Sequence, residues 1–223
     1  MSFNVQHFKN YISKKIDYKS IVNLIKQYDI DIIGLNEVFG KFIVKGQAER
    51  IAKKLGYYCY FGKATNLAFR NYGNAIISKY PILNTEIIHI PYPIKIEKHY
   101  QKRTILKANI LVNNKVLHVY ITHIGLNNDE KINGINTIIN NLSTNNCILM
   151  GDFNMTNDNK LIKDISNVLV DTLPNKELNS YPSINPKRKI DYIFVSNDID
   201  IVSSDILNII ISDHLPHIAE LEI

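Results

Sequence analysis

The sequence predicts an α/β fold in which two sheets pack against each other and helices cover the outside. Three observations support this prediction. Strand-like apolar runs outnumber helical patterns, helical patterns occur in both halves of the chain, and some of them lead directly into a buried strand. No linker, repeat or low-complexity segment interrupts the 223 residues, so we expect a single domain over residues 1–223.

Three segments repeat apolar residues at helical spacing. They cover residues 21–28, 48–55 and 132–142. The first leads into the run 30–35 and the third into the run 147–150, and both runs are apolar enough to form buried strands. This alternation is typical of β-α-β units.

The other predicted strands follow one another along the chain. The first residues, 1–5, enter a strand-like segment at once, and the pair Asn113-Asn114 predicts a hairpin turn because Asn tolerates positive φ. The remaining predicted strands are 57–61, 74–78, 85–90, 103–111, 116–122, 190–195, 201–207 and 217–223.

Composition limits the function classes only loosely. The chain has 26 basic and 21 acidic residues, a net charge of +5 and a pI near 9.0, which permits a polyanionic partner without proving one. Cys59 and Cys147 lie in apolar runs without metal-ligand spacing, so we expect reduced thiols. Neither a signal-peptide pattern nor a membrane-spanning run is present in the sequence, and we expect a cytoplasmic protein.

Polar residues recur where predicted apolar strands end. A carboxylate can orient water or hold a hard cation, and an amide adds a donor and an acceptor without charge. Polar residues at five strand ends are better explained by one shared cleft than by independent chance, so we expect such a cleft. The residues concerned are Asn4, Asn36-Glu37, Thr122-His123, Asp152 with Asn154, and Ser212-Asp213-His214, together with Asp191 inside the apolar run 189–194.

Each of these residues also has an ordinary structural interpretation. Glu37 could start a helix or be solvated, and His123 could be a satisfied histidine at a sheet edge. Asp191 could form a structural ion pair with Lys189 or Arg188.

Two further interpretations stay open. The segment 151–154 could be a plain turn, and Asp213 could cap the turn before Pro216. Five other histidines show no partner pattern and are predicted to be structural or surface residues: His7, His89, His99, His118 and His217.

The ordered series of motifs resembles the endonuclease/exonuclease/phosphatase superfamily of deoxyribonuclease I-like phosphoesterases, and most closely its compact bacterial-type members. The resemblance implies a four-layered α/β/β/α sandwich of two packed mixed sheets with helices on the outer faces. It also implies a Mg²⁺-dependent phosphoesterase with its site at one end of the sheets. The motifs are Asn4, 33–37, 73–78, Thr122-His123, Gly151-Asp152-Phe153-Asn154, 190–194 and 212–216.

The resemblance also implies roles for the metal-side residues. Glu37, Asn4 and Asp213 would hold Mg²⁺, for which Mn²⁺ is a plausible substitute. Two positions depart from the family pattern. Asn36 replaces the usual Gln before the metal-binding Glu, and Gln6 stands where several repair nucleases carry a second acidic contact.

The remaining roles concern water and phosphate. Asp152 would orient the attacking water, and His214 would either take its proton or, as an imidazolium, bind a phosphate oxygen. Asp191 would fix the orientation of His214. Donors to the phosphate and other substrate contacts would come from His123, Asn154, Arg103 and Asn74.

Three functions are compatible with this pattern. The leading one is a nuclease or nucleic-acid phosphodiesterase, acting as a monomer. The second is a lipid or small-molecule phosphoesterase, including a sphingomyelinase-like enzyme or a phosphatase, for which the segment 87–94 could offer an apolar contact loop. The third is a catalytically silent binding domain. The first rests on candidate rim cations Lys63, Arg70, Lys95, Lys98, Lys102, Lys187 and Arg188.

Overall fold

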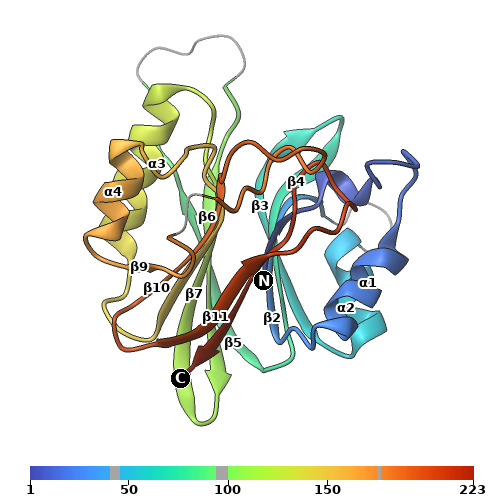
Figure 1. Cartoon of the computed structure of the whole chain (residues 1–223), viewed down its shortest axis with the longest axis horizontal. Helices are drawn as coiled ribbons and strands as arrows, with labels where there is room; N and C mark the ends of the chain where they lie inside the picture. Colours follow the sequence, from blue (N-terminus) through green and yellow to red (C-terminus); the bar gives the residue numbers. More distant parts are fainter. Residues whose placement is uncertain (41–45, 94–99, 175–176) are drawn as a thin grey trace.

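Strands dominate the computed structural model of the chain, which describes residues 1–40, 46–93, 100–174 and 177–223 (Figure 1). The helical elements are the 3-10 turn η1 (Gln6–Phe8), α1 (Tyr18–Gln27), α2 (Gln47–Leu55), α3 (Asn128–Asn141) and α4 (Lys160–Ser166). The strands are β1 (Ser2–Asn4), β2 (Ile32–Phe39), β3 (Tyr58–Leu67), β4 (Arg70–Ser78), β5 (Ile82–His89), β6 (Thr104–Val112), β7 (Lys115–His123), β8 (Cys147–Asp152), β9 (Val170–Asp171), β10 (Asp191–Val195), β11 (Asp200–Ile206) and β12 (His217–Glu222).

The strands form two six-stranded sheets. The first sheet has the order β11-β12-β1-β2-β4-β3, and the second has the order β5-β6-β7-β8-β10-β9. Both sheets are mixed, because β1–β2 and β7–β8 are parallel pairs and the other neighbours are antiparallel. This confirms the predicted fold class of two packed mixed sheets.

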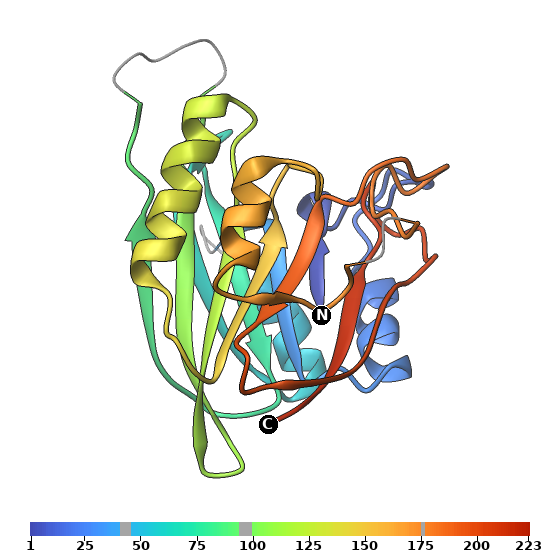
Figure 2. The ribbon, with the colours of Figure 1, turned by 60° about the vertical axis from the view of Figure 1, so that its left-hand side comes forward.

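Apolar cores hold the layers together. Ile21 and Ile25 of α1 and Ile51 of α2 pack on the outer face of the first sheet. On the second sheet, Ile138 of α3 and Ile165 of α4 cover the outer face. A third core, containing Ile76, Leu106, Ile121, Met150 and Ile193, fills the space between the sheets. Figures 1 and 2 show the resulting order of helices, sheet, sheet and helices.

The helices begin and end where their sequences provide caps. The Asp17 carboxylate accepts a hydrogen bond from the Ser20 amide at the start of α1. Asn127 and Glu130 form a capping box at the start of α3. Helix α2 ends at Gly56, whose φ of 74° suits glycine. These local signals explain why all three predicted helices are present close to their predicted bounds.

Several elements differ from the sequence prediction. Strand β2 does not end before Asn36 but continues to Phe39, with a register shift between Leu35 and Val38. Glu37 therefore lies in an irregular part of the strand, with φ of 59°, and neither starts a helix nor follows the strand. Helix α4 was not predicted, because its apolar pattern is only seven residues long.

Two other features bear on the sequence predictions. The turn at Asn113-Asn114 has φ values of 49° and 63° and joins β6 to β7. Within the described ranges, the helices are too short or too polar to span a bilayer.

Candidate active site

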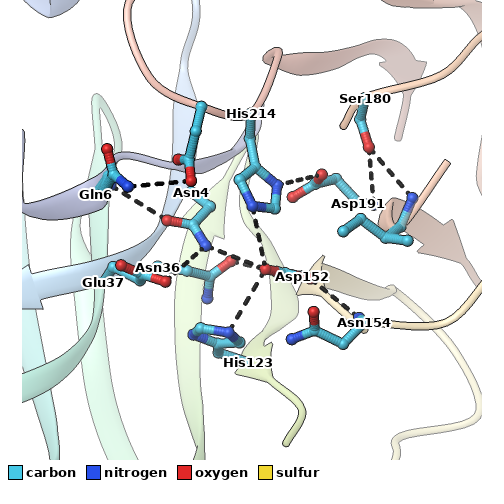
Figure 3. Close-up of polar contacts among 12 residues, drawn as sticks. Asn4, Gln6, Asn36, Glu37, His123, Asp152, Asn154, Ser180, Asp191 and His214 are labelled. Carbon is cyan, nitrogen blue, oxygen red and sulfur yellow. Dashed lines mark hydrogen bonds and ion pairs between the residues drawn. The ribbon is translucent and has the colours of Figure 1, made fainter. Parts of the chain in front are cut away.

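The site forms where strand ends from both sheets meet. In the second sheet, His123 of β7 pairs in register with Asp152 of β8, and Asp152 pairs with Asp191 of β10. Three neighbouring strands therefore place one imidazole and two carboxylates side by side. In the first sheet, Asn4 of β1 pairs in register with Asn36 of β2. Figure 3 shows these side chains facing one another, together with His214 from the loop between β11 and β12.

Gly151 allows strand β8 to bring Asp152 into this position. Its φ is 149°, and a Cβ atom at this position would lie 1.9 Å from the Thr122 carbonyl oxygen of β7. No other residue type fits so close to the neighbouring strand. The glycine before the carboxylate is thus required by packing.

Asp152 is the centre of the site. Its Oδ2 accepts a hydrogen bond from Asn4 Nδ2 at 3.0 Å and lies 3.5 Å from His123 Nε2 and 3.6 Å from His214 Nε2. Its Oδ1 accepts from the Asn154 backbone amide at 3.0 Å. The residue is 1% exposed, and this burial raises the pKa of the Asp152 carboxyl group.

Asp191 pairs with His214. Asp191 Oδ2 lies 2.8 Å from His214 Nδ1, and the hydroxyl of Ser180 accepts hydrogen bonds from the Ile190 and Asp191 amides (Figure 3). Burial lowers the pKa of His214, but the nearby Asp191 and Asp152 carboxylates raise it more, so the net shift is upward. A carboxylate that fixes one imidazole nitrogen leaves the other directed at Asp152.

The alternative prediction, in which Asp191 forms an ion pair with Lys189 or Arg188, is wrong. Lys189 Nζ instead lies 2.6 Å from Asp171 Oδ2 and also donates to the Leu173 carbonyl oxygen. Arg188 is exposed, with its guanidinium 5.1 Å from the Tyr181 ring centre. The Asp191 carboxylate is therefore bound by an imidazole and not by a basic neighbour.

Arg103 determines which nitrogen of His123 carries a proton. Arg103 Nη1 lies 3.0 Å from His123 Nδ1, and a guanidinium can only donate. His123 Nδ1 therefore accepts, which leaves the proton on Nε2, the atom nearest Asp152. Burial, Arg103 and His214 all lower the pKa of His123 well below its usual value. His123 is thus a neutral donor directed at the centre of the site.

Asn36 and Asn74 join the two sheets beneath the site. Asn36 Nδ2 donates to Asn74 Oδ1 at 2.9 Å and to the Thr122 carbonyl oxygen at 2.8 Å, while its Oδ1 accepts from the Asp152 amide at 3.0 Å. Asn74 Nδ2 donates to the Thr104 carbonyl oxygen at 3.2 Å. Asn74 is buried, and both groups of its side-chain amide are used in this bridge between the sheets.

Oxygen donors suited to a metal lie on the other side of Asp152. Glu37 Oε1 accepts from Asn4 Nδ2 at 3.2 Å, and Asp213 Oδ2 accepts from Gln6 Nε2 at 3.0 Å. Glu37 and Asp213 are only partly buried. Carboxylate oxygens with amide side chains beside them are the ligand type that a hard divalent cation prefers, so these residues fit such an ion. Asp152, Asp191 and His214 lie close enough together to share an ion, but they are buried and already bonded to one another.

His7, which the sequence predicts to be a structural or surface residue, lies beside Glu37. Its Nε2 lies 3.8 Å from Glu37 Oε2, and its ring stacks on Phe39 with centroids 4.4 Å apart. Burial lowers the pKa of His7 although the Glu37 carboxylate raises it. The available signal was position, because His7 lies in the short turn η1 directly after β1, which ends at Asn4.

The remaining predicted contacts lie around the site. Asn154 has φ of 51° and donates from Nδ2 to the Ile124 carbonyl oxygen at 2.9 Å, which leaves one amide hydrogen for another partner. Among the predicted rim cations, Lys95 and Lys98 lie outside the described residues, as does Ile94 of the predicted apolar loop. The other rim cations are exposed: Lys63, Arg70, Lys102, Lys187 and Arg188.

The fold and the placement of the site at one end of two packed sheets are those of the α/β-sandwich phosphoester hydrolases. The chain belongs to the Endonuclease/Exonuclease/phosphatase family. The sequence profile of this family matches residues 1–214. No curated protein sequence matches the chain significantly.

Solved structures share the fold at low sequence identity. An endonuclease/exonuclease/phosphatase family protein from Leptotrichia buccalis is 23% identical, covers 100% of this chain and 98% of its own, and gives a TM-score of 0.79. A relative from Beutenbergia cavernae is 18% identical over 99% of this chain and 70% of its own, with a TM-score of 0.83. A mannosyl-6-phosphatase from Bacteroides thetaiotaomicron is 16% identical over 92% and 90%, with a TM-score of 0.76.

Proposed function

We propose that this protein is a divalent-metal-dependent phosphodiesterase that cleaves nucleic acid by attack of water on phosphorus. One observation carries the proposal. A buried carboxylate, Asp152, faces the Nε2 atoms of two histidines, and an open carboxylate, Glu37, shares the amide of Asn4 with it. A base, phosphate donors and a cation ligand therefore surround one point, as hydrolysis of a phosphoester requires.

Asp152 would position the attacking water and accept its proton. A carboxylate whose pKa is raised by burial is a better base near neutral pH than an exposed one. Its backbone is fixed by Asn36 and its Oδ1 by the Asn154 amide, so the carboxylate has one orientation. This arrangement supports the assignment of the water to Asp152.

His214 would bind a nonbridging phosphate oxygen as an imidazolium. Its Nδ1 is bonded to Asp191, and its Nε2 faces Asp152, so both ring nitrogens face carboxylate oxygens that can only accept. This environment favours the donor role over the alternative in which His214 takes the proton of water. Asp191 would act by orienting the ring.

Three further donors would stabilise the charge that develops on the phosphate. His123 would donate from Nε2, with Arg103 holding its tautomer and adding its own positive charge. Asn154 would donate the amide hydrogen that Ile124 does not bind. Donors aimed at transition-state charge typically contribute about 10²–10³ in rate each.

Glu37, Asn4 and Asp213 would hold the cation. Asn4 is buried, whereas Glu37 and Asp213 are partly exposed, so solvent and a substrate oxygen can approach from their side. Mg²⁺, or Mn²⁺ in its place, would supply Lewis acidity to the phosphoryl group and balance charge on the leaving oxygen.

The preference for nucleic acid rests on the cations around the site. Arg70 lies with its guanidinium 4.4 Å from the Phe39 ring centre, next to the His7 and Glu37 side. Lys102 precedes Arg103, and Arg188 lies over Tyr181, whose ring is 4.8 Å from His214. Positive groups on several sides of the site favour a polyanionic substrate over a single phosphate.

A small-molecule phosphomonoester is the second candidate, because one of the similar structures is a mannosyl-6-phosphatase. Turnover of single-stranded DNA, duplex DNA, RNA, a sugar 6-phosphate and sphingomyelin, each with Mg²⁺ and with Mn²⁺, separates the candidates. We expect metal-dependent cleavage of a nucleic acid that an Asp152→Asn protein purified in parallel lacks. Cleavage of the sugar phosphate or the lipid without cleavage of any nucleic acid would refute the substrate assignment.

A further inference from the structure

The loop after β1 directs His7 at the carboxylate of Glu37. Its ring stacks on Phe39, with centroids 4.4 Å apart, and contacts the tilted ring of Tyr72 at 5.5 Å. Gln47 of α2, which is 4% exposed, donates to the His7 carbonyl oxygen at 2.7 Å and accepts from the Phe39 amide at 2.8 Å. Both the ring and the backbone of His7 are therefore held in place.

The backbone is strained where these residues meet. Gln6, His7 and Phe8 have φ values of 41°, 60° and 60°, and Glu37 has φ of 59°. Residues other than glycine disfavour this region by about 1–2 kcal/mol each. Such strain persists where the surrounding structure enforces it, and it concentrates at functional sites. The left-handed turn at residues 6–8 is what directs His7 toward Glu37.

The donor atoms of His7 and Glu37 are spaced for one shared cation. His7 Nε2 and Glu37 Oε2 are 3.8 Å apart, too long for a hydrogen bond. Divalent ions bind nitrogen and oxygen at about 2.1 Å, so two ligands of one ion lie up to about 4.2 Å apart. The adjacent residue Gln6 donates from its amide to Asp213. Because the Gln6 side chain is neutral, Gln6 brings no negative charge to the site.

We propose that His7 Nε2 is a metal ligand together with Glu37, and that this nitrogen gives the site a preference for Mn²⁺ or a later transition metal over Mg²⁺. The inference rests on the proposed function only in placing the cation at Glu37. Imidazole binds transition metals well, whereas Mg²⁺ prefers oxygen ligands and retains its waters. The metal preference of this chain is thus determined by a residue of the first loop.

Pulsed electron paramagnetic resonance of the Mn²⁺-loaded protein tests the proposal without measuring activity. We expect coupling to a directly bound ¹⁴N nucleus in the wild type, and its loss in His7→Asn. Asn tolerates positive φ, so this variant keeps the turn. His118→Asn is the matched control, because His118 lies within β7, away from the site residue His123 at the end of that strand, and bonds Asn109. We expect this control to keep the coupling.

Calorimetric titrations complete the test. Loss of His7 should weaken Mn²⁺ binding by about 10–100-fold, the range typical of groups that support a metal site, and should weaken Mg²⁺ binding much less. A wild-type spectrum without ¹⁴N coupling, or a coupling that survives in His7→Asn, would overturn the proposal. If His7→Asn fails to fold, His7→Gln gives the same comparison. Nitrogen coupling without any nuclease activity would refute the proposed substrate and leave the ligand assignment intact.

Discussion

The two sides of the site differ in how tightly the protein holds them. We call Asp152, Asp191 and His214 the water side of the site. Their side chains are 2%, 0% and 6% exposed and are bonded to one another or to the backbone. On the metal side, Glu37 and His7 are 25% and 27% exposed, and strained backbone positions them. The groups proposed to handle the proton are therefore held by several bonds, whereas the groups proposed to bind the cation are more open to solvent.

The comparison predicts that the water side carries the larger catalytic effect. Replacing Asp152 by Asn keeps the shape of the side chain and removes the base, so kcat should fall by about 10²–10⁴-fold. The melting temperature should not fall, because a buried carboxylate is replaced by a neutral amide. Steady-state kinetics and calorimetry measure both quantities. Asp200→Asn, at the exposed start of β11, is the control, and comparable turnover in the two variants would contradict the role of Asp152.

The second-largest loss of kcat should come from removing Arg103, the partner of the proposed donor His123. Arg103→Gln should lower kcat by about 10²–10³-fold, because His123 loses the partner that keeps its proton on Nε2. Imidazole ¹⁵N spectra report the tautomer directly. We expect a proton on Nε2 of His123 in the wild type and a tautomer mixture in the variant. Wild-type spectra with the proton on Nδ1 would disprove the assignment.

Both sides also depend on the amide bridge between the sheets. Asn36→Ala removes three buried hydrogen bonds, to Asn74, Thr122 and Asp152, and leaves their partners unpaired. Each unpaired buried group costs about 1–3 kcal/mol, so the free energy of unfolding should fall by several kcal/mol. Urea denaturation measures this change. Asn84→Ala, which removes an exposed amide pair with Asn109, is the control and should cost less than about 1 kcal/mol. Equal losses would show that the bridge is not important for stability.

The smallest effect comes from the residue behind Asp191. His217 Nδ1 lies 3.3 Å from the Asp191 carbonyl oxygen, and burial together with Lys189 lowers the pKa of His217 to about 3. The unfolded chain binds a proton near pH 6.5 and the folded chain does not. Stability from this group is therefore complete above pH 6.5 and is lost as the pH falls toward 3, by about 1.4 kcal/mol per pH unit.

The His217→Gln variant isolates this contribution. Between pH 6.5 and pH 5, the wild type should lose about 2 kcal/mol more unfolding free energy than the variant. Urea unfolding at the two pH values gives both numbers. An identical pH dependence in the two proteins would show that His217 does not stay neutral in the fold.

The water side was the more predictable side from sequence. Asp191 lies inside a continuous apolar run, so its burial was expected before its partner was known, and Asp152 was expected at the end of such a run. The partner of Asp191 depends on long-range structure. Strand register pairs Asp152 with Asp191, and the loop between β11 and β12 places His214 beside them. Register is a long-range property, which explains why Lys189 remained an equally reasonable partner for Asp191 in the sequence.

The metal side could be predicted only in part. Glu37 was expected after the strand, but its direction depends on the irregularity of β2 and on φ of 59°, which no local pattern indicates. The approach of His7 to Glu37 could not be predicted, because it depends on a left-handed turn of residues that disfavour one. The single-domain organisation, the monomeric state and the cytoplasmic location stay predictions.

The central claim is that the two sides form one active site, and a double-mutant cycle of Asp152→Asn and Glu37→Gln tests it most directly. Single-turnover hydrolysis of an activated phosphodiester is measured for the wild type, both single variants and the double variant at saturating Mn²⁺. Residues that act as a unit have strongly non-additive effects. We predict a double variant about as slow as Asp152→Asn alone. A rate reduced by the full product of the two single losses would contradict the claim.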